Sequence, residues 1–128
     1  MLPGLTSALD HKIDGLIVGN TTISRPELQS EHRGQAGGLS GAPLRALALQ
    51  RIRDFRKATG AAIPLIGVGG IESGPDVYDR IRAGASLVQL YTALVYQGPG
   101  LIRTILSELD ECFEADGITS IAEAVGTG

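Results

Sequence analysis

The stretch from Ile63 to Leu94, IPLIGVGGIESGPDVYDRIRAGASLVQLYTAL, decides the fold of this chain. It contains two continuous apolar runs of strand length, separated by a segment that carries helix start and stop signals. Gly69-Gly70 follows the first run, and Tyr91-Thr92 follows the second. We predict a strand, a helix and a second strand over residues 64–68, 76–83 and 86–90.

Local signals mark the ends of this helix and indicate further β/α units on either side. Ser73, three residues before Asp76, resembles a capping box, and Gly60 and Gly84 are placed to end two of the helices. The apolar run IDGLIV predicts a buried strand, and apolar residues at helical spacing predict the flanking helices. We predict a strand over residues 13–18 and a long loop over 23–38. Helices are predicted over 43–57 and 101–114, and a short final helix over 118–125.

The alternation of strands and helices implies an α/β fold with a parallel sheet, in a doubly wound sheet or a (β/α)8 barrel. A complete barrel needs roughly 250 residues, whereas this chain has 128. Three strands cannot close a barrel, and the first twelve residues, MLPGLTSALDHK, have neither strand nor helix periodicity. We therefore expect an irregular segment over 1–12 and, over 13–128, a chain that starts partway into its domain.

Composition indicates a globular protein and gives no sign of a nucleic-acid, disulfide or metal site. With 43% apolar and 20% charged residues the chain is typical of a globular protein, and no transmembrane segment or signal peptide is recognised. A formal net charge of −3, without a basic patch, gives no reason to expect nucleic acid as a partner. The single Cys112 excludes an internal disulfide and lies on an apolar helical stripe, which favours packing. The sequence places no carboxylate or cysteine at metal-ligand spacing from His11 or His32, so no metal site is predicted.

Gly69 and Gly70 are candidates for binding an anion. Bare glycine backbone where a strand meets a helix N-terminus suits an anionic group, because unpaired N–H donors converge there. Tyr91 and Thr92 can present a backbone N–H and a hydroxyl to the same anion, and the last part of a (β/α)8 barrel holds a phosphate with two such units. The alternatives are close packing of strand against helix for the glycines, and core packing for the tyrosine.

Two other polar groups of residues are candidates for ligand contacts. Asn20, Thr21 and Thr22 follow the first predicted strand, where an amide and hydroxyls can bond a planar, amide-rich ligand. Their alternative role is an Asx or ST turn. Ser40 and Gly41, within GGLSG, lie either in a loop that approaches a ligand or at a helix N-cap. No residue stands out as a general base or nucleophile.

Four motifs, in order along the chain, resemble the C-terminal part of dihydroorotate dehydrogenases. They are NTTISRP, GGLSGAPL, IPLIGVGGIESG and AGASLVQLYTAL, and the resemblance covers nearly all of residues 13–126. GGLSG and GVGGI are shared with the soluble class of that family. NTT-x-SR and LVQLYTAL favour the membrane-associated, quinone-using class. The fold that this resemblance implies is the C-terminal three β/α units of a (β/α)8 TIM barrel, incomplete, with FMN-phosphate-binding strand ends over 13–128.

The resemblance also implies a cofactor, FMN, and a reaction. The family oxidises dihydroorotate to orotate in pyrimidine (UMP) biosynthesis and, in this class, reduces a quinone. Asn20 and Thr21 match the pair that hydrogen-bonds the orotate ring. Gly19 matches a flavin-contact position where the family more often has a residue such as threonine, so a side-chain contact is lost. The other positions matching flavin contacts are Ser40, Gly41, Gly69, Gly70, Tyr91 and Thr92, the last four around the FMN phosphate.

Parts of the family pattern have no counterpart in these 128 residues. They are the catalytic serine that takes the proton from dihydroorotate, the lysine against the flavin and the N-terminal helical hairpin that admits quinone. We therefore predict no catalytic residue here and expect that the chain alone is inactive or needs a complementing N-terminal barrel half. The alternative is a non-catalytic remnant that binds FMN or phosphate. The resemblance implies a cytoplasmic location, or a peripheral one on the cytoplasmic membrane.

Overall fold

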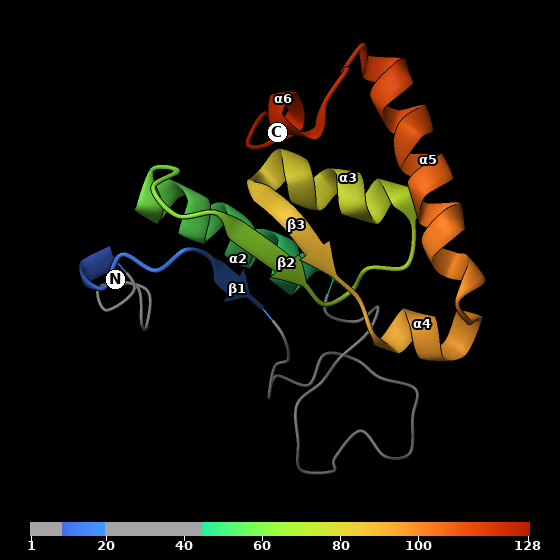
Figure 1. Cartoon of the computed structure of the whole chain (residues 1–128), viewed down its shortest axis with the longest axis horizontal. Coiled ribbons are helices and arrows are strands. Elements are labelled where there is room, and N and C mark those ends of the chain that lie inside the picture. Colours follow the sequence, from blue (N-terminus) through green and yellow to red (C-terminus); the bar gives the residue numbers. More distant parts are fainter. Residues whose placement is uncertain (1–8, 20–44) are drawn as a thin grey trace.

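The computed structural model describes residues 9–19 and 45–128, and the account below concerns these ranges (Figure 1). Three strands form one parallel sheet in the order β1-β2-β3: Leu16–Val18, Leu65–Val68 and Ala85–Gln89. The helices are α2 Arg45–Thr59, α3 Gly74–Ala83, α4 Thr92–Gln97, α5 Gly100–Asp116 and α6 Ile121–Ala124. Parallel strands alternating with helices confirm the predicted α/β class.

The strand boundaries differ from the predicted ones by one to three residues. β1 starts at Leu16 rather than at residue 13, because its pairing with β2 begins where the Leu16 N–H donates to the Pro64 carbonyl at 3.0 Å. β3 starts at Ala85, one residue early, directly after the glycine that ends α3. The β2–β3 register shifts between Leu65 and Ile66.

The start of α3 follows the predicted capping signal with one change. The Ser73 side chain accepts a hydrogen bond from the Asp76 N–H at 3.3 Å, as an N-cap does. The Asp76 carboxylate does not return the bond to Ser73 and instead accepts from the Glu72 N–H at 3.0 Å. Gly84, with φ 133°, ends the helix as predicted. α3 also starts earlier than predicted, with Pro75 in its first turn, where a missing N–H costs no hydrogen bond.

The remaining helices include one that the sequence pattern did not predict. α4 has only six residues, too few for apolar periodicity to separate it from the strand that precedes it. α2 ends at Thr59, followed by Gly60 with φ 59°, as the glycine signal predicted. α5 exceeds the predicted 101–114 by one residue at its start and two at its end. None of the helices in the described ranges is long and apolar enough to cross a membrane.

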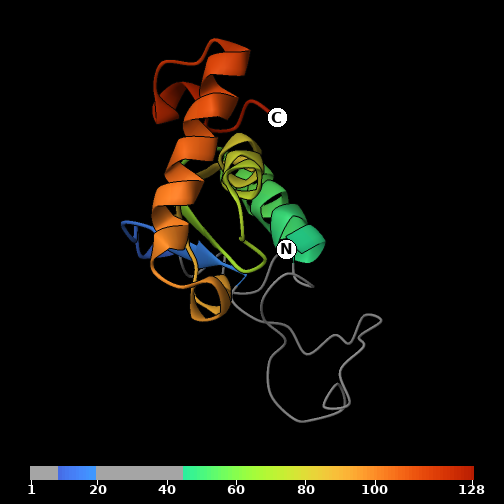
Figure 2. The ribbon, with the colours of Figure 1, turned by 90° about the vertical axis from the view of Figure 1, so that its right-hand side faces the viewer.

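Two apolar clusters hold the elements together. α2 and α3 lie side by side on one side of the sheet (Figure 2), and Ile52 and Leu65 are fully buried in the cluster between them and the strands. The second cluster joins α3 to α5 through Val77, Ile81 and Ile105. Cys112 is half-buried against this second cluster, which confirms its predicted packing role.

The opposite face of the sheet and the free side of β3 are exposed. The side chain of Ile17 is 52% exposed and that of Leu87 64% exposed. An apolar groove of about 270 Å³ lies between β3, α3 and α5, and we call it the β3 groove. Ile102 and Leu106, on the apolar stripe of α5, are exposed and line this groove. Among the described residues, nothing covers the outer edge of β3.

Candidate functional site: the strand-end turn

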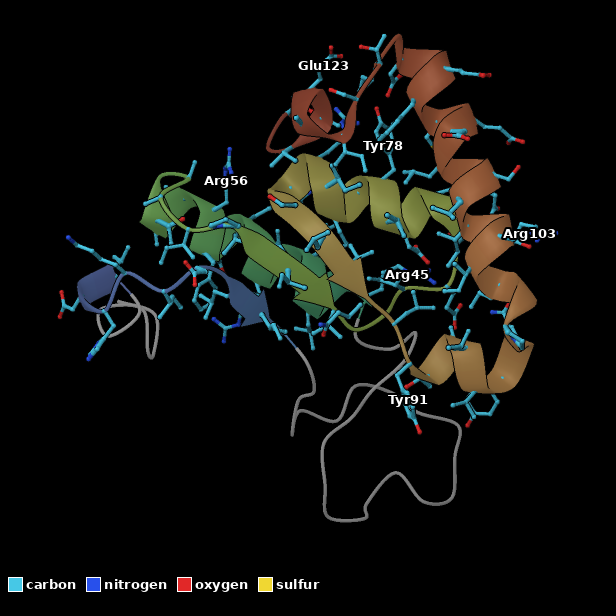
Figure 3. The ribbon with its side chains drawn as sticks, viewed as in Figure 1. Arg45, Arg56, Tyr78, Tyr91, Arg103 and Glu123 are labelled. Atoms are coloured by element: carbon cyan, nitrogen blue, oxygen red, sulfur yellow. The ribbon has the colours of Figure 1, made fainter. Side chains whose placement is uncertain are left out.

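The register of β2 and β3 brings two of the predicted site segments to the same edge of the sheet. Val68 is paired with Gln89, and these are the last residues of their strands. Gly69-Gly70 therefore follows the carboxyl end of β2, and Tyr91-Thr92 follows the carboxyl end of the neighbouring strand β3. Tyr91 lies at the start of α4 with its side chain directed away from the sheet (Figure 3). This edge is where (β/α)8 barrels bind their ligands.

The Gly69-Gly70 turn has a backbone that requires glycine. The φ angle is 99° at Gly69 and 68° at Gly70, values that other residues rarely adopt. At Gly70 an added Cβ would also lie 2.5 Å from the backbone N and Cα of Arg45, the first residue of α2. Close packing of the strand end against a helix, the alternative given for these glycines, therefore explains part of the need for glycine at Gly70. At Gly69 the need comes from the φ angle.

Two arginines hold the two carbonyl groups of this turn. The Arg80 Nη2 donates to the Gly69 carbonyl at 2.7 Å, and the Arg45 Nε donates to the Gly70 carbonyl at 3.4 Å. Because every peptide bond described is trans, each N–H points away from the carbonyl of its own peptide group. The N–H groups of Gly70 and Ile71 are thus turned away from the arginines, and neither donates a backbone hydrogen bond to another described residue. Two N–H donors without a described partner, on a turn backed by a buried arginine, can bind an anion.

Arg45 is held in place by two carboxylates. Its Nε lies 3.0 Å from Oδ1 of Asp76, and its Nη2 lies 3.4 Å from Oε2 of Glu72. Asp76 is almost fully buried, and its second oxygen accepts the Glu72 N–H. These contacts tie the start of α2 to the start of α3 across the turn. Charge-assisted bonds to a buried carboxylate are stronger than surface ion pairs.

Arg80 is fully buried, at 0% exposure. Its Nε and Nη1 have no hydrogen-bond partner in the described part of the chain. Burial lowers the pKa of the Arg80 guanidinium, and the charges of Asp76 and Asp79 oppose that effect. The sequence analysis missed this residue because arginine is usually exposed. Its position, three residues after Val77 and one before Ile81, is a signal that could have placed it on the buried face of the helix.

The other predicted site residues are described only in part. Gly19 follows β1 with φ 80°, and an added Cβ there would lie 3.6 Å from the Val68 carbonyl oxygen. Tyr91 is 77% exposed, so it is not a packing residue in this structure. Thr92 is half-buried and is the first residue of α4. The remaining predicted site residues, Asn20, Thr21, Ser40 and Gly41, lie outside the described residues.

The described part of the site suits binding better than proton transfer. It presents backbone donors, two cations and the exposed Tyr91 at one edge of the sheet. Residues 9–19 and 45–128 contain no group of three histidine, cysteine or carboxylate side chains that could hold a metal ion. No described carboxylate or histidine lies free beside the turn as a general base, because Asp76 and Glu72 are both bonded to Arg45.

Three parallel β/α units with a glycine turn at the carboxyl end of a strand define this protein as a parallel α/β protein, the class that includes (β/α)8 barrels. The family model for dihydroorotate dehydrogenase matches residues 5–113. The chain therefore belongs to the dihydroorotate dehydrogenase family, as the resemblance of its four motifs predicted.

Curated relatives from bacteria and plants are named dihydroorotate dehydrogenase (quinone). The chain is 61% identical over 120 residues to a dihydroorotate dehydrogenase (quinone) of Novosphingobium aromaticivorans, covering 94% of this chain and 34% of the relative. It is 53% identical over 121 residues to the mitochondrial dihydroorotate dehydrogenase (quinone) of Arabidopsis thaliana, covering 93% of this chain and 26% of the relative. The chain thus spans about a quarter to a third of the length of these relatives.

Solved structures confirm the fold. The crystal structure of the dihydroorotate dehydrogenase of Eimeria tenella in complex with ferulenol superimposes with a TM-score of 0.92 at 45% sequence identity. The match covers 96% of this chain and 33% of that one. The ligand-free structure of the same enzyme matches equally well, also with a TM-score of 0.92. The three β/α units are therefore an incomplete (β/α)8 barrel, as predicted.

Proposed function

We propose that this chain supplies the FMN-phosphate and orotate contacts of an FMN-dependent dihydroorotate dehydrogenase (quinone). The observation that carries the proposal is the Gly69-Gly70 turn, whose carbonyls are held by Arg80 and Arg45 while two N–H groups point away from them. A phosphate dianion suits such a turn, because the N–H donors and the buried positive charge of Arg80 act together. Tyr91 and Thr92, from the neighbouring strand end, complete the proposed phosphate site.

The remaining proposed contacts follow from the family motifs. Asn20 and Thr21 hydrogen-bond the orotate ring, and Ser40 and Gly41 contact the flavin. Gly19 contributes backbone only. When bound, FMN supplies the hydride acceptor for the oxidation of dihydroorotate to orotate. The residues of this chain bind and orient the two molecules and do not themselves move the proton.

Turnover, in this proposal, depends on residues beyond these 128. They contain no counterpart of the family's catalytic serine, which takes the proton from dihydroorotate. We propose that a complementing N-terminal barrel half supplies that serine and the access route for the quinone acceptor. The uncovered face of the sheet, with Ile17 and Leu87 exposed, is apolar as such an interface requires.

A second candidate function is a non-catalytic protein that binds FMN or phosphate. The absence of a counterpart to the catalytic serine favours it for the chain on its own. The two candidates share the phosphate site and differ in whether the chain contributes to turnover. One experiment can therefore separate them after binding has been measured.

The binding experiment titrates the chain into FMN and follows flavin fluorescence. We expect saturable binding that Gly69→Ala weakens, because alanine at φ 99° is strained and displaces the turn. Gly117→Ala is the matched control, because Gly117 also has a positive φ, 69°, and has nothing within 4 Å of an added Cβ. Equal affinity in the wild-type chain and both variants would contradict the proposed phosphate site.

The activity experiment adds the N-terminal part of the Novosphingobium aromaticivorans relative. The mixture is assayed for dihydroorotate-dependent reduction of a quinone-coupled dye, with each chain alone as control. Activity only in the mixture supports the enzyme proposal. FMN binding without activity in the mixture supports the non-catalytic candidate. Turnover by this chain alone would contradict the proposed need for the N-terminal half.

A further inference from the structure

Arg80 is a buried cation without a carboxylate partner in the described part of the chain. The ion pairs found there join Arg45 to Glu72 and to Asp76, and Arg80 takes part in neither. Within residues 9–19 and 45–128, its one hydrogen bond runs from Nη2 to the Gly69 carbonyl at 2.7 Å, and Nε and Nη1 have no partner. A fully buried arginine is rare unless it is paired. Of the residues that the structure describes, Asp76 and Asp79 act on Arg80 through their charges, but neither carboxylate forms an ion pair with it.

The position of Arg80 shows where a bound anion would act. The guanidinium bonds the carbonyl side of the Gly69-Gly70 turn, opposite the N–H groups of Gly70 and Ile71, which have no partner among the described residues. Arg45 holds the next carbonyl, but its own charge is paired with Asp76 and Glu72. In the part of the chain that the structure describes, the charges of Asp76 and Asp79 favour the Arg80 cation, and those of Arg45 and Arg53 oppose it. Asp76 is already engaged by Arg45, and Asp79 is exposed.

We propose that Arg80 is the positioning residue of the phosphate site. It holds the Gly69 carbonyl inward so that the turn presents its N–H groups, and its buried charge attracts the phosphate through the turn. The anion it serves is the FMN phosphate, so this inference rests on the proposed function. Arginine suits the role because its planar fork binds a carbonyl while its charge remains permanent.

A purely structural role for Arg80 makes a different prediction from this one. An arginine that only stabilises the packing of α3 on the sheet affects every flavin alike, because the isoalloxazine ring and ribityl chain are common to FMN and riboflavin. An arginine that serves the phosphate affects FMN alone. The ratio of the two affinities therefore separates the roles, whatever the overall stability of the variant.

The experiment measures dissociation constants of FMN and riboflavin by fluorescence titration of the full chain. We expect Arg80→Gln to weaken FMN binding by a factor of about 10 to 100, the range for a lost charged hydrogen bond. Riboflavin binding should change by less than about twofold. Arg80→Lys keeps the charge and should restore part of the preference for FMN. Circular dichroism confirms that each variant is folded.

Arg82→Gln is the matched control. Arg82 lies on the same helix and carries the same charge, but its guanidinium is 5.5 Å from the Tyr78 ring centroid. The Arg82→Gln variant should leave the preference for FMN over riboflavin unchanged. If Arg80→Gln does not fold, Arg80→Lys decides, with FMN affinity expected to fall several-fold and riboflavin affinity to hold.

The outcomes distinguish this inference from the proposed function. A wild-type chain that prefers FMN, with the same preference in the Arg80 variants, overturns the role of Arg80 alone. Equal losses of affinity for FMN and riboflavin in the Arg80 variants also overturn the role of Arg80 alone. A wild-type chain with no preference for FMN over riboflavin overturns both the phosphate site and the role of Arg80. Loss of the FMN preference in the Arg80 variants, with Arg82→Gln unaffected, supports the inference.

Discussion

The backbone N–H of Gly74 donates a hydrogen bond to Oε1 of Glu108, 3.2 Å away, where the start of α3 meets α5. The contact is close because Gly74 has no side chain. An added Cβ would lie 2.7 Å from the carbonyl carbon of Glu108 and from the backbone N of Leu109. Both atoms belong to the backbone of α5, so no side-chain rotation can make room.

Gly74→Ala should therefore destabilise the chain by forcing α3 and α5 apart. We expect a loss of about 1–3 kcal/mol, the usual cost of overpacking, measured as a lower midpoint of urea unfolding. Gly100→Ala is the control, because nothing lies within 4 Å of an added Cβ there. That variant should be neutral, or more stable by up to about 1 kcal/mol. Equal midpoints for the two variants would contradict the close packing of α3 on α5.

The link between Tyr78 and Asp116 should appear as a dependence of stability on alkaline pH. The Tyr78 hydroxyl donates to the Asp116 carboxylate, and this bond, with burial, raises the Tyr78 pKa above its usual value near 10.0. A raised pKa favours the protonated form in the folded state. The stabilisation is therefore complete below the pKa of the unfolded chain and is lost as pH rises through the raised value.

Asp116→Asn should lower the Tyr78 pKa, because it removes the negative charge beside the hydroxyl. An NMR titration that follows the Tyr78 ring resonances measures the shift directly. Glu114→Gln is the control, because Glu114 is exposed on the same helix and is not among the groups that shift the Tyr78 pKa. If Asp116→Asn leaves the titration of Tyr78 unchanged, the hydrogen bond does not form in solution.

Cys112 should react slowly with thiol reagents in the folded chain. Its side chain is half-buried, and burial raises the thiol pKa, with a further rise from the nearby carboxylates, Asp116 first. Because the thiolate is the reactive species, modification should be at least about tenfold slower than in the urea-unfolded chain. The double variant Ser107→Cys with Cys112→Ala places a thiol at an exposed position of the same helix and should react faster. Equal rates for the two positions would contradict the packing role of Cys112.

The exposed apolar surfaces should make the isolated chain associate. Each aliphatic side chain left uncovered forgoes about 1.5–3 kcal/mol, against a typical domain stability of about 5–15 kcal/mol. The uncovered sheet face and the β3 groove leave several such side chains exposed. We expect sedimentation velocity to show species that grow with protein concentration. A monomer with a cooperative thermal transition in dilute solution would contradict this.

Leu87→Lys tests where that association takes place. Leu87 lies on β3 and is 64% exposed, and a lysine at a sheet edge hinders pairing with another chain. The variant should associate less than the wild-type chain at the same concentration. Leu47→Lys is the control, because Leu47 is exposed on α2, away from the sheet face. Equal effects of the two lysines would place the association elsewhere.

The parts of the fold that could be predicted from the sequence are those with local causes. Ser73 and Gly84 bound α3 through backbone geometry within a few residues, and the pattern predicted both. α4 could not be predicted, because six residues do not repeat a helical pattern. Arg80 could not be assigned a role either. A charged residue on the apolar face of a helix is favourable only if a group from a distant part of the sequence accepts its hydrogen bonds or neutralises its charge.

The sequence by itself determined the three β/α units, the N-cap of α3, the glycines that end α2 and α3, and the motifs that place the chain in its family. These follow from residue types a few positions apart. Only the tertiary structure decided that Arg80 and Arg45, from different helices, hold the two carbonyls of the Gly69-Gly70 turn. That arrangement depends on how α2 and α3 pack on the sheet. The β2–β3 register likewise places Tyr91 at the same edge, and no local pattern encodes either relationship.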